Sequence, residues 1–531
     1  MILYIIIYVI CGVYMILNFK HDIQMLQQNS YRINRFWKWL KGDISSGWRL
    51  IDLAMLFLLF STLLNTALIS IIIAMVCIGK CGYILTRKFK KPLVFTPRVR
   101  RIYTVTAVIA CGIVACIGFT LKFTPDAIAY YNSVQVTLGT LLLLCVVSWA
   151  VVIAAVIILT PVEKMINRRY YNEAADILAS MPDLKIIGIT GSYGKTSTKH
   201  YLERILSEKF DVLMTPGSYN TPMGVIRTIR EMMKPYNEVF ICEMGAKQKG
   251  DIKEICDLVH PQIGIVTAVG PMHLESFKSI ENVQSTKFEL IDSLPADGLA
   301  VVNNDFEFCA NRKVENVECL RYTVNGVAES DFLVENVKYS PDGSSFTVVT
   351  PKGENINLTT KLLGECNISN LAGAVVVALH LGVPVENIRN AVASIGQVEH
   401  RLNVNRIPGG VTIIDDAFNS NPSGARMAVD VLSQFTDGKR IIVTPGMIEL
   451  GNRQTQLNTE LGKYIGEHVD VAIIVGQYNR DALVTGVESS DFNRDNLYVV
   501  DSFNAALQLL ATIQKPGDTI LYENDLPDTF K

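Results

Sequence analysis

The residues best suited to chemistry lie in one stretch, Ile186–Lys199, with the sequence IIGITGSYGKTSTK. Its β-branched start predicts a buried strand, followed by a glycine loop (191–194) and a helix that begins near Lys195. In such a unit the backbone N–H groups of the loop and helix start bind phosphate. Lys195 would reach the β- and γ-phosphates, and the Thr196 hydroxyl would ligate Mg²⁺. Ile189 replaces the first glycine of the strict GxxxxGK[ST] pattern, but the flanking strand and helix favour a phosphate site over an ordinary turn.

Three further residues lie in or directly after predicted elements and are candidates for the same site. Glu243 ends a short buried strand, and an acidic residue at the carboxyl end of a strand can hold Mg²⁺. His273 follows another strand, 263–269, which delivers it to the same edge of the sheet. Lys287 lies in a segment with a helical pattern, and on its own it is an ordinary surface lysine.

Length and composition limit the class of protein. The chain has 531 residues, enough for about three domains. Its net charge of −2 argues against a nucleic-acid-binding surface. The eleven cysteines contain no CxxC pair, so they favour neither zinc nor a disulfide framework and suit a reducing cytosol.

Most of the apolar excess lies before Pro161, which predicts an N-terminal α-helical transmembrane domain over residues 1–165. Crossing the hydrocarbon of a bilayer takes roughly 20 apolar residues. Four runs meet this need: Met1–Leu17, Leu50–Gly79, Ile102–Leu121 and Val136–Thr160. The first has no basic start and no cleavage site after it, which predicts an uncleaved span rather than a signal peptide.

The charges of the loops give an orientation. Residues 122–135 carry a single lysine, whereas the loop after the second run is strongly basic, with Lys80, Arg87, Lys88, Lys90, Lys91, Arg98, Arg100 and Arg101. By the positive-inside rule, this basic loop and everything after Thr160 lie in the cytoplasm. We therefore expect a multi-pass protein of the cell membrane whose catalytic domains are cytoplasmic.

The basic segment 20–49 fits that orientation in one of two arrangements. If Leu50–Gly79 crosses once, segment 20–49 lies outside, and the run as a single helix would be about 45 Å long, too long for a simple crossing. A bend near Asn65 would instead form a re-entrant pair and leave both basic segments inside. The sequence leaves both arrangements open, with four or five spans.

Other residues of this domain are not expected to form a site. Asp52 and Asp126 lie near the ends of apolar runs, where solvated carboxylates are the expected interpretation. The sequence RFWKWL (35–40) mixes aromatic and basic residues, which is typical of an interfacial helix.

Strands alternate with helical stretches through residues 166–396, which predicts a central α/β domain with a parallel sheet. Within it, turn signals at 325–326 and 341–343 predict a β-hairpin inset over 319–362. The sequence does not indicate a function for this inset. Strands also alternate with helical segments through residues 397–531, which predicts a second, Rossmann-like α/β domain. Its expected strands are 411–414, 440–444, 471–475, 497–500 and 519–522.

Seven motifs follow one another in a fixed order. They are TGSYGKTSTK (190–199), TPGSYNTPMG (215–224), EMGAKQKGDI (243–252), GPMHLESFKSIENVQSTKFELI (270–291), GECNISNLAGAVVVAL (364–379), EHRL (399–402) and DDAFNSNPSG (415–424). Together they resemble the ATP-dependent Mur ligases, and most of all the MurF branch, which adds D-alanyl-D-alanine to the UDP-muramoyl tripeptide. The resemblance covers roughly residues 181–531.

The resemblance implies a set of site residues. Those that would bind the nucleotide are Gly191, Ser192, Gly194, Lys195, Thr196, Ser197, Asn370 (adenine side), Arg401 (transferred phosphate) and Asp416 (ribose). Two Mg²⁺ ions would be held by Thr196, Glu243, His273 and Lys287, and Lys287 matches a family lysine that is often carbamylated. The catalytic set would be Lys195, Glu243, His273, Lys287 and Arg401. Several negative charges meet in such a reaction, and Mg²⁺, Lys and Arg neutralise them.

The resemblance also implies the chemistry. A carboxylate attacks the γ-phosphate of ATP, an amine attacks the resulting acyl phosphate, and ADP and phosphate leave. The C-terminal domain would close over ATP and bring the amine, which excludes water from the acyl phosphate. We therefore expect a membrane-anchored ligase of peptidoglycan or envelope synthesis.

The departures from the family pattern concern the parts that hold the substrate. The membrane domain stands in place of the soluble domain that grips the UDP-sugar in the MurF branch, so no region obviously binds uridine. Thr221-Pro222 replaces an expected Asn-Glu pair, and Thr444-Pro445-Gly446 stands where Gly-Asp is more usual. We expect an acyl donor held at the membrane, either a lipid-linked cell-wall intermediate or a growing envelope polymer. The expected partners are a small-molecule or lipid-linked envelope precursor and an amine substrate, and a poly-amino-acid or capsule-type ligase is an alternative function.

Two other readings are weaker. A membrane P-loop ATPase that drives transport fits spans followed by a nucleotide domain, but no LSGGQ-like helix start is found and the ordered motifs would have no explanation. An inactive homologue would have no fold-stability reason to retain Lys195, Glu243, His273 and Lys287 together. The identity of the acyl donor and amine and the oligomeric state are left open.

Overall fold

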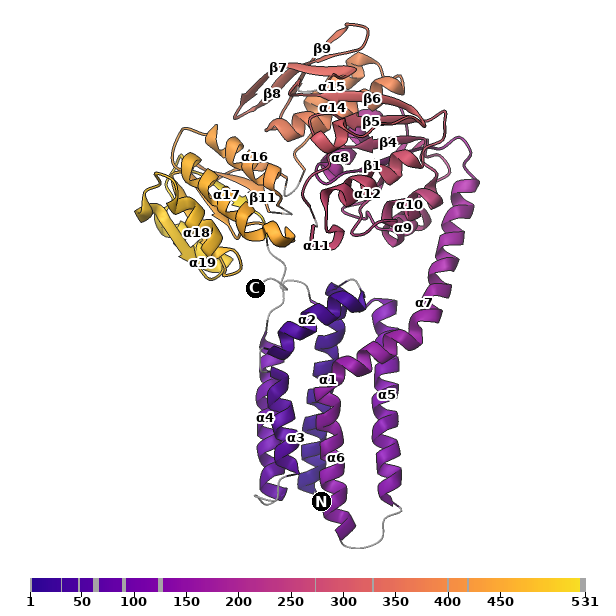
Figure 1. Cartoon of the computed structure of the whole chain (residues 1–531), viewed down its shortest axis with the longest axis vertical. Helices are drawn as coiled ribbons and strands as arrows, with labels where there is room; N and C mark the ends of the chain where they lie inside the picture. The colour runs from indigo at the N-terminus through magenta and orange to yellow at the C-terminus, as the bar shows by residue number, and fades with distance from the viewer. Residues whose placement is uncertain are drawn as a thin grey trace. The chain divides into compact units, whose positions relative to one another are not determined.

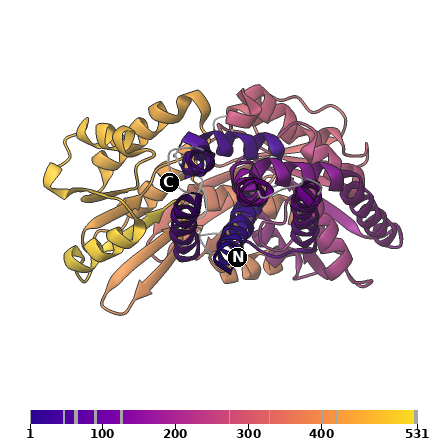
Figure 2. The same cartoon turned by 90° about the horizontal axis from the view of Figure 1, so that it is seen from below.

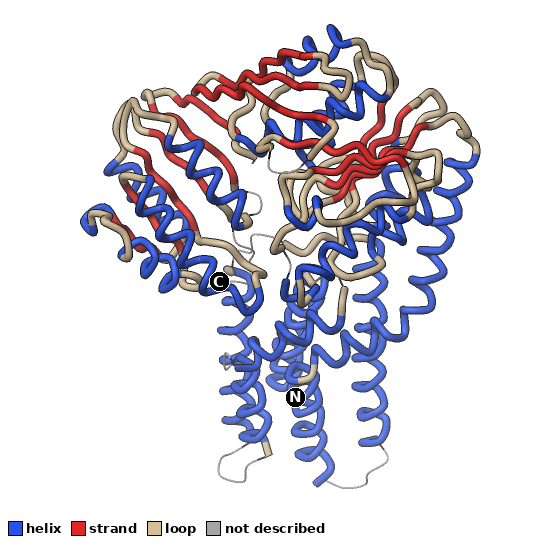
Figure 3. Tube along the Cα trace, turned by 45° about the horizontal axis from the view of Figure 1, so that its top comes forward, coloured by secondary structure: helices blue, strands red, loops and turns tan. Residues whose placement is uncertain are grey.

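The computed structural model describes residues 2–29, 31–45, 48–60, 66–87, 92–122, 128–272, 274–326, 329–398, 401–417 and 420–525. It separates into two compact units, Met1–Arg168 and Arg169–Leu526. Helix α7 begins in the first unit and ends in the second. Strands occur in the second unit, and the described part of the first is helical (Figure 3).

The first unit is a bundle of apolar helices (Figures 1 and 2). Its elements are α1 (Ile2–Gln28), α2 (Ile33–Ser45), α3 (Trp48–Leu59), α4 (Thr66–Thr86), α5 (Pro97–Lys122), α6 (Ile128–Val146) and α7 (Ser148–Ala179). Among the described residues, four helical segments are long and apolar enough to cross a membrane: residues 2–28, 67–86, 97–117 and 148–179. In α2, the expected interfacial helix, Phe36 and Leu40 are buried and Trp37 is exposed.

The apolar run 50–79 is two helices rather than one. Lys80 near the end of α4 contacts Asp52 near the start of α3, so the two helices run antiparallel. Gln27 at the end of α1 exchanges hydrogen bonds with the Val94 backbone through its side-chain amide, so the chain just before α5 lies beside that end of α1. Two antiparallel helices fit the arrangement with a bent pair rather than a single crossing helix. Residues 61–65, which contain the expected bend near Asn65, and residues 88–91 of the basic segment lie outside the described residues.

The run 136–160 is also interrupted, contrary to the expectation of one continuous span. α6 ends at Val146 and α7 begins at Ser148. The Asn18 side chain on α1 donates to the Cys145 carbonyl at 3.0 Å and so satisfies a carbonyl beside the break. An apolar sequence gives no sign of such a break, because the compensating donor comes from a different helix.

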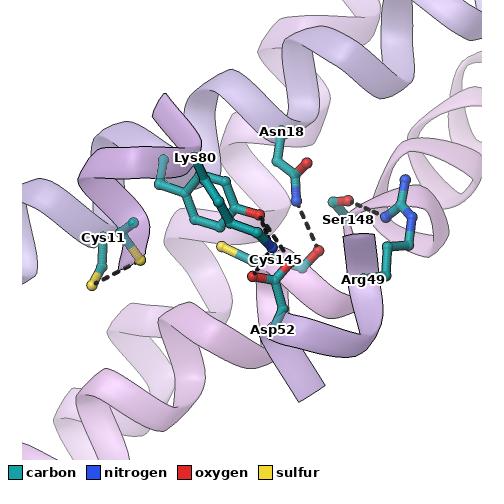
Figure 4. Close-up of polar contacts among 9 residues, drawn as sticks. Cys11, Asn18, Arg49, Asp52, Lys80, Cys145 and Ser148 are labelled. Carbon is teal, nitrogen blue, oxygen red and sulfur yellow. Dashed lines mark hydrogen bonds and ion pairs between the residues drawn. The ribbon is translucent and has the colours of Figure 1, made fainter. Parts of the chain in front are cut away.

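The interior of the bundle contains charged side chains, shown in part in Figure 4. We name this group the bundle charge cluster; its members are Tyr14, Asp22, Arg49, Asp52, Lys80 and Ser148. Asp52 is fully buried, accepts from Lys80 Nζ at 2.7 Å and accepts from the Tyr14 hydroxyl at 2.8 Å. The interpretation of Asp52 as a solvated carboxylate is therefore wrong, while Asp126 lies outside the described residues.

The second pair of the bundle charge cluster connects α3 to α1 and α7. Arg49 donates to Asp22 on α1 at 2.5 Å and to the Ser148 hydroxyl on α7 at 2.9 Å. Ser148 in turn donates to Asp22 at 2.5 Å. Arg49 and Asp52 are three residues apart on α3, so one turn of that helix carries both pairs.

The second unit begins with a nine-stranded sheet in the order β2-β3-β1-β4-β5-β6-β7-β8-β9. The strands are β1 (Lys185–Thr190), β2 (Val212–Met214), β3 (Val239–Glu243), β4 (Ile263–Val266), β5 (Leu299–Asn303), β6 (Glu318–Thr323), β7 (Phe332–Ser340), β8 (Gly343–Val349) and β9 (Asn355–Thr360). Pairing is parallel from β2 to β7 and antiparallel from β7 to β9. The predicted parallel sheet is confirmed.

The segment 319–362 is only partly the predicted hairpin inset. β7 and β8 form a hairpin, with β9 beside β8, and the predicted turn at 341–343 connects β7 to β8. However, β6 pairs in parallel with β5, so these strands extend the central sheet rather than form a separate inset. Pairing between distant strands is not visible in local alternation.

Helices cover both faces of this sheet (Figure 1). One face packs against α8 (Lys195–Leu206), α14 (Glu365–His380) and α15 (Val385–Ser394). The other packs against α9 (Pro222–Met232), α10 (Asp251–Val259), α12 (Ile280–Asp292), α13 (Glu307–Ala310) and the end of α7. The short helix α11 (Leu274–Phe277) precedes α12. In β1, Ile186 joins the second core and Ile187 the first, as the period-2 alternation of a strand requires.

A six-stranded sheet follows in the order β10-β11-β15-β12-β13-β14. Its elements are β10 (Asn403–Ile407), β11 (Val411–Asp416), α16 (Pro422–Ser433), β12 (Arg440–Thr444), α17 (Gln454–His468), β13 (Val471–Val475), α18 (Arg480–Glu488), β14 (Leu497–Val500), α19 (Phe503–Ile513) and β15 (Thr519–Glu523). Only β10 is antiparallel among these strands. All five predicted strands are present, and the expectation of a second α/β sheet is confirmed.

Candidate nucleotide and metal site

The glycine loop between β1 and α8 adopts backbone conformations that favour glycine. Gly194 has φ 79°, and a Cβ there would lie 2.0 Å from the Asn370 side-chain oxygen. Lys195 Nζ donates to the Gly191 carbonyl at 2.6 Å, so the side chain folds back over the loop. Burial lowers the pKa of Lys195 to about 8, the nearby Arg401 charge adds to this effect, and Glu243 opposes it.

Glu243 ends β3 beside the start of α8, as its position in the sequence predicts. Its side chain is 1% exposed, and its Oε2 accepts from the Thr196 hydroxyl at 3.1 Å. Burial would raise the pKa of Glu243, but the charges of Lys199 and Lys195 hold it below its usual value. A carboxylate and a hydroxyl therefore converge at the mouth of the phosphate loop.

Two residues that the motif reasoning did not single out complete this corner. Lys199 Nζ lies 3.0 Å from Glu243 Oε2, and the Asn220 side chain donates to Glu243 Oε1 at 2.9 Å. One signal for Lys199 was available, because it lies four residues after Lys195 and so on the same helical face. Asn220 carried no such signal, since its contact depends on how the loop after β2 approaches β3.

Lys287 lies on α12 and is 3% exposed, so the view of it as a surface lysine is wrong. Burial lowers the pKa of Lys287 well below its usual value, and the charge of Lys195 lowers it further. Burial and the neighbouring charge therefore disfavour the charged form of this amine, which lies within electrostatic range of Lys195 in the phosphate loop.

Arg401 and Asp416 lie where the first sheet leads into the second. Asp416 ends β11 and accepts from the Leu402 backbone N–H at 3.3 Å. Burial raises the pKa of Asp416 to about 7, while the charge of Arg401 opposes this shift. Arg401 acts on both Lys195 and Asp416, so these residues form one electrostatic group.

The remaining nucleotide residues lie around the same loop. Ser192 exchanges hydrogen bonds with Gly270, which starts the segment leading to His273. The Thr198 hydroxyl donates to the Asn370 side chain at 3.3 Å, and Ser197 is buried on α8. His273 itself lies outside the described residues.

The donors at this corner fit Mg²⁺. Thr196 and Glu243 offer oxygen atoms, which Mg²⁺ prefers, and it usually completes its shell with water and phosphate oxygens. No group of three or more His, Cys, Asp or Glu comes together among the described residues, so a soft-metal site is not indicated there. The Lys199 ammonium already forms an ion pair with the Glu243 carboxylate.

Comparisons with known proteins match the second unit. The model of the Mur ligase middle domain matches residues 189–378, and that of the Mur ligase glutamate ligase domain matches residues 400–522. Two UDP-N-acetylmuramoyl-tripeptide--D-alanyl-D-alanine ligases are similar. That of Haemophilus influenzae is 27% identical over 333 residues (62% of this chain, 71% of the relative), and that of Mycobacterium tuberculosis 30% over 375 (66% and 71%).

A solved structure shows the same likeness. The MurF ligase of Thermotoga maritima in complex with ADP gives a TM-score of 0.61 at 25% identity, covering 68% of this chain and 80% of that one. Both family matches begin after residue 188, so the helical bundle lies outside them.

Proposed function

Because this chain belongs to the Mur ligase family and is most similar to its MurF branch, we propose that it is an ATP-dependent ligase of envelope synthesis anchored in the cell membrane. The ligase would join the carboxyl group of an envelope precursor to the amine of an amino acid or dipeptide. The observation that carries this proposal is the convergence of Lys195, Thr196 and Glu243 at the loop between β1 and α8. The family match gives no support to the transport alternative.

The chain's own residues account for most of the chemistry. Lys195 and the backbone of the glycine loop would bind the β- and γ-phosphates, and Arg401 would bind the phosphoryl group in transfer. Asp416 would contact the ribose and Asn370 the adenine side. Mg²⁺, when bound by Thr196 and Glu243, supplies charge neutralisation to the phosphate oxygens.

Lys287 suits a second role. Its depressed pKa makes the neutral amine easier to reach than in a solvated lysine, and a neutral amine adds CO₂ to give a carbamate and release one proton. The product is a carbamate anion in place of the neutral amine, and this anion would serve with His273 as a ligand for a second Mg²⁺. We propose that Lys287 is carbamylated in the active enzyme.

We further propose that the acyl donor is held at the membrane surface. Both family matches lie after residue 188, and the apolar helices stand where a UDP-sugar-binding domain would be expected. The cationic end of the bundle, with α2 beside it, would face the cytoplasm and attract anionic head groups. A lipid-linked envelope precursor combines such an anion with an anchor.

One assay tests the proposed function. Purified full-length protein in liposomes would be given ATP, Mg²⁺ and D-alanyl-D-alanine with either UDP-muramoyl tripeptide or its lipid-linked counterpart, and ADP release measured. We expect ADP release that needs both donor and amine, and a faster rate with the lipid-linked donor. Equal rates with the two donors would refute the membrane-held donor, and ADP release independent of the amine would refute the ligase.

A further inference from the structure

Lys199 is a buried cation to which the family motifs assign no role. It lies one helical turn after Lys195 on α8, and its side chain is 0% exposed. Its Nζ lies 3.0 Å from Glu243 Oε2 and donates to the Gly217 carbonyl at 2.5 Å. A buried ammonium is tolerated only when it is paired and hydrogen-bonded, so these two contacts define its position.

Both oxygens of Glu243 are already engaged. Thr196 donates to Oε2, the oxygen that Lys199 contacts, and Asn220 donates to Oε1. Of the described residues, only Lys199 forms an ion pair with this carboxylate. Without a metal ion, the charge of Glu243 is therefore balanced by Lys199.

The carboxylate that Lys199 neutralises is the proposed ligand of Mg²⁺. Two cations on one carboxylate oxygen repel each other, and the repulsion is strong where water is excluded. The phosphates of a nucleotide would offset this repulsion with their own negative charge. Mg²⁺ without nucleotide has no such compensation.

We propose that Lys199 is a resident counter-ion of the metal site, meaning a side-chain cation that balances Glu243 until Mg²⁺ and nucleotide arrive together. On their arrival the ammonium leaves Glu243 and keeps its hydrogen bond to Gly217. This inference rests on the proposed function, which supplies Mg²⁺ and ATP. Its consequence is linkage: nucleotide raises the affinity for Mg²⁺, and Mg²⁺ raises the affinity for nucleotide by the same factor.

The test is calorimetric titration of the detergent-solubilised full-length protein with Mg²⁺, first without nucleotide and then with saturating ADP. In Lys199→Met we expect Mg²⁺ to bind about tenfold more tightly or better without nucleotide, because the competing cation is gone. The stimulation by ADP should shrink by the same factor. Lys209→Met is the matched control, since this exposed lysine contacts the Leu381 and Gly382 carbonyls and its loss removes the same charge.

Two more variants keep the test decisive. Lys199→Gln removes the charge but retains a hydrogen-bond donor, and it replaces Lys199→Met if that variant does not fold. Lys199→Arg retains the charge and should preserve the wild-type linkage. Nucleotide-free Mg²⁺ affinity that is unchanged or weaker in a folded neutral variant, relative to Lys209→Met, overturns the proposal. Wild-type protein that binds no ADP would instead contradict the proposed function.

Discussion

The molecule buries charge in two regions and balances it differently. In the bundle charge cluster, Asp22 pairs with Arg49 and Asp52 with Lys80, so each anion contacts one cation. The hydroxyls of Tyr14 and Ser148 occupy the remaining acceptor positions. The cluster is neutral and its hydrogen bonds are satisfied, which is how buried charges are stabilised without a ligand.

The edge of the central sheet has the opposite balance. Glu243 is the carboxylate at this corner; Lys199 forms an ion pair with it, and the charge of Lys195 also lowers its pKa. The charge of Lys195 acts in turn on Lys287. The depressed pKa values of Lys195 and Lys287 follow from burial, and for Lys287 also from the charge of Lys195. Basic groups outnumber the carboxylate at this corner, which suits the binding of anions such as phosphate. The bundle charge cluster, by contrast, holds helices together.

Replacing a lysine of the unbalanced cluster should have the largest effect on function. Lys195→Met removes the ammonium that would contact the β- and γ-phosphates, and we expect turnover to fall by about 10³-fold. Folding should be retained, because Lys195 donates its hydrogen bonds to the loop carbonyls of Gly191 and Ser192. Coupled ADP-release assays and circular dichroism measure the two outcomes, and near-normal turnover would remove Lys195 from the site.

Breaking the balanced cluster should affect stability instead. Lys80→Met leaves Asp52 buried without its cation, and we expect a loss of about 3–5 kcal/mol in unfolding free energy. The double variant Asp52→Asn/Lys80→Met keeps an acceptor for Tyr14 and removes both charges, so it should recover most of that loss with normal turnover.

Thermal unfolding in detergent and ADP-release assays on the two variants check this contrast. A double variant that is stable but inactive would show that the bundle charge cluster takes part in function. That result would abolish the distinction drawn between the two regions.

A smaller effect is expected from Asp416, whose pKa is raised to about 7 in the folded protein from 3.8. Between these two values the folded state holds a proton that the unfolded state lacks, so stability falls as pH rises through that window and levels off above pH 7. Asp416→Asn removes this dependence. Relative to wild type, the variant should gain up to roughly 1 kcal/mol per pH unit between pH 4 and 7, and thermal unfolding at several pH values measures it.

Sequence reasoning succeeded where a local pattern decides the structure. Short apolar runs alternating with helical segments gave the strands of the second sheet, and the rule that parallel strands end at one edge placed Glu243 beside the phosphate loop. The sequence-based prediction failed where contact with a residue distant in the chain determines the structure. The burial of Asp52 needs Lys80 from another helix, and the break at Val147 needs Asn18 on α1.

Lys199 falls between these two cases. Its helical spacing from Lys195 indicated the face on which it lies, but its ion pair exists only because β3 ends beside α8. A side chain whose role depends on tertiary approach leaves only a weak trace in one sequence. The same is true of Asn220, which reaches Glu243 from the loop after β2.

The smallest effect is expected where charge is exposed to water. Arg227 and Glu231 form an i,i+4 pair on α9, and both side chains are more than half exposed. Arg227→Ala should leave both the unfolding free energy and turnover without a measurable change, because solvent and salt screen such pairs. This variant is the reference for the comparison, because it removes a cation that is exposed to solvent. A loss in thermal unfolding as large as that of Lys80→Met would mean that ion pairing by itself, and not burial, determines what a charge contributes here.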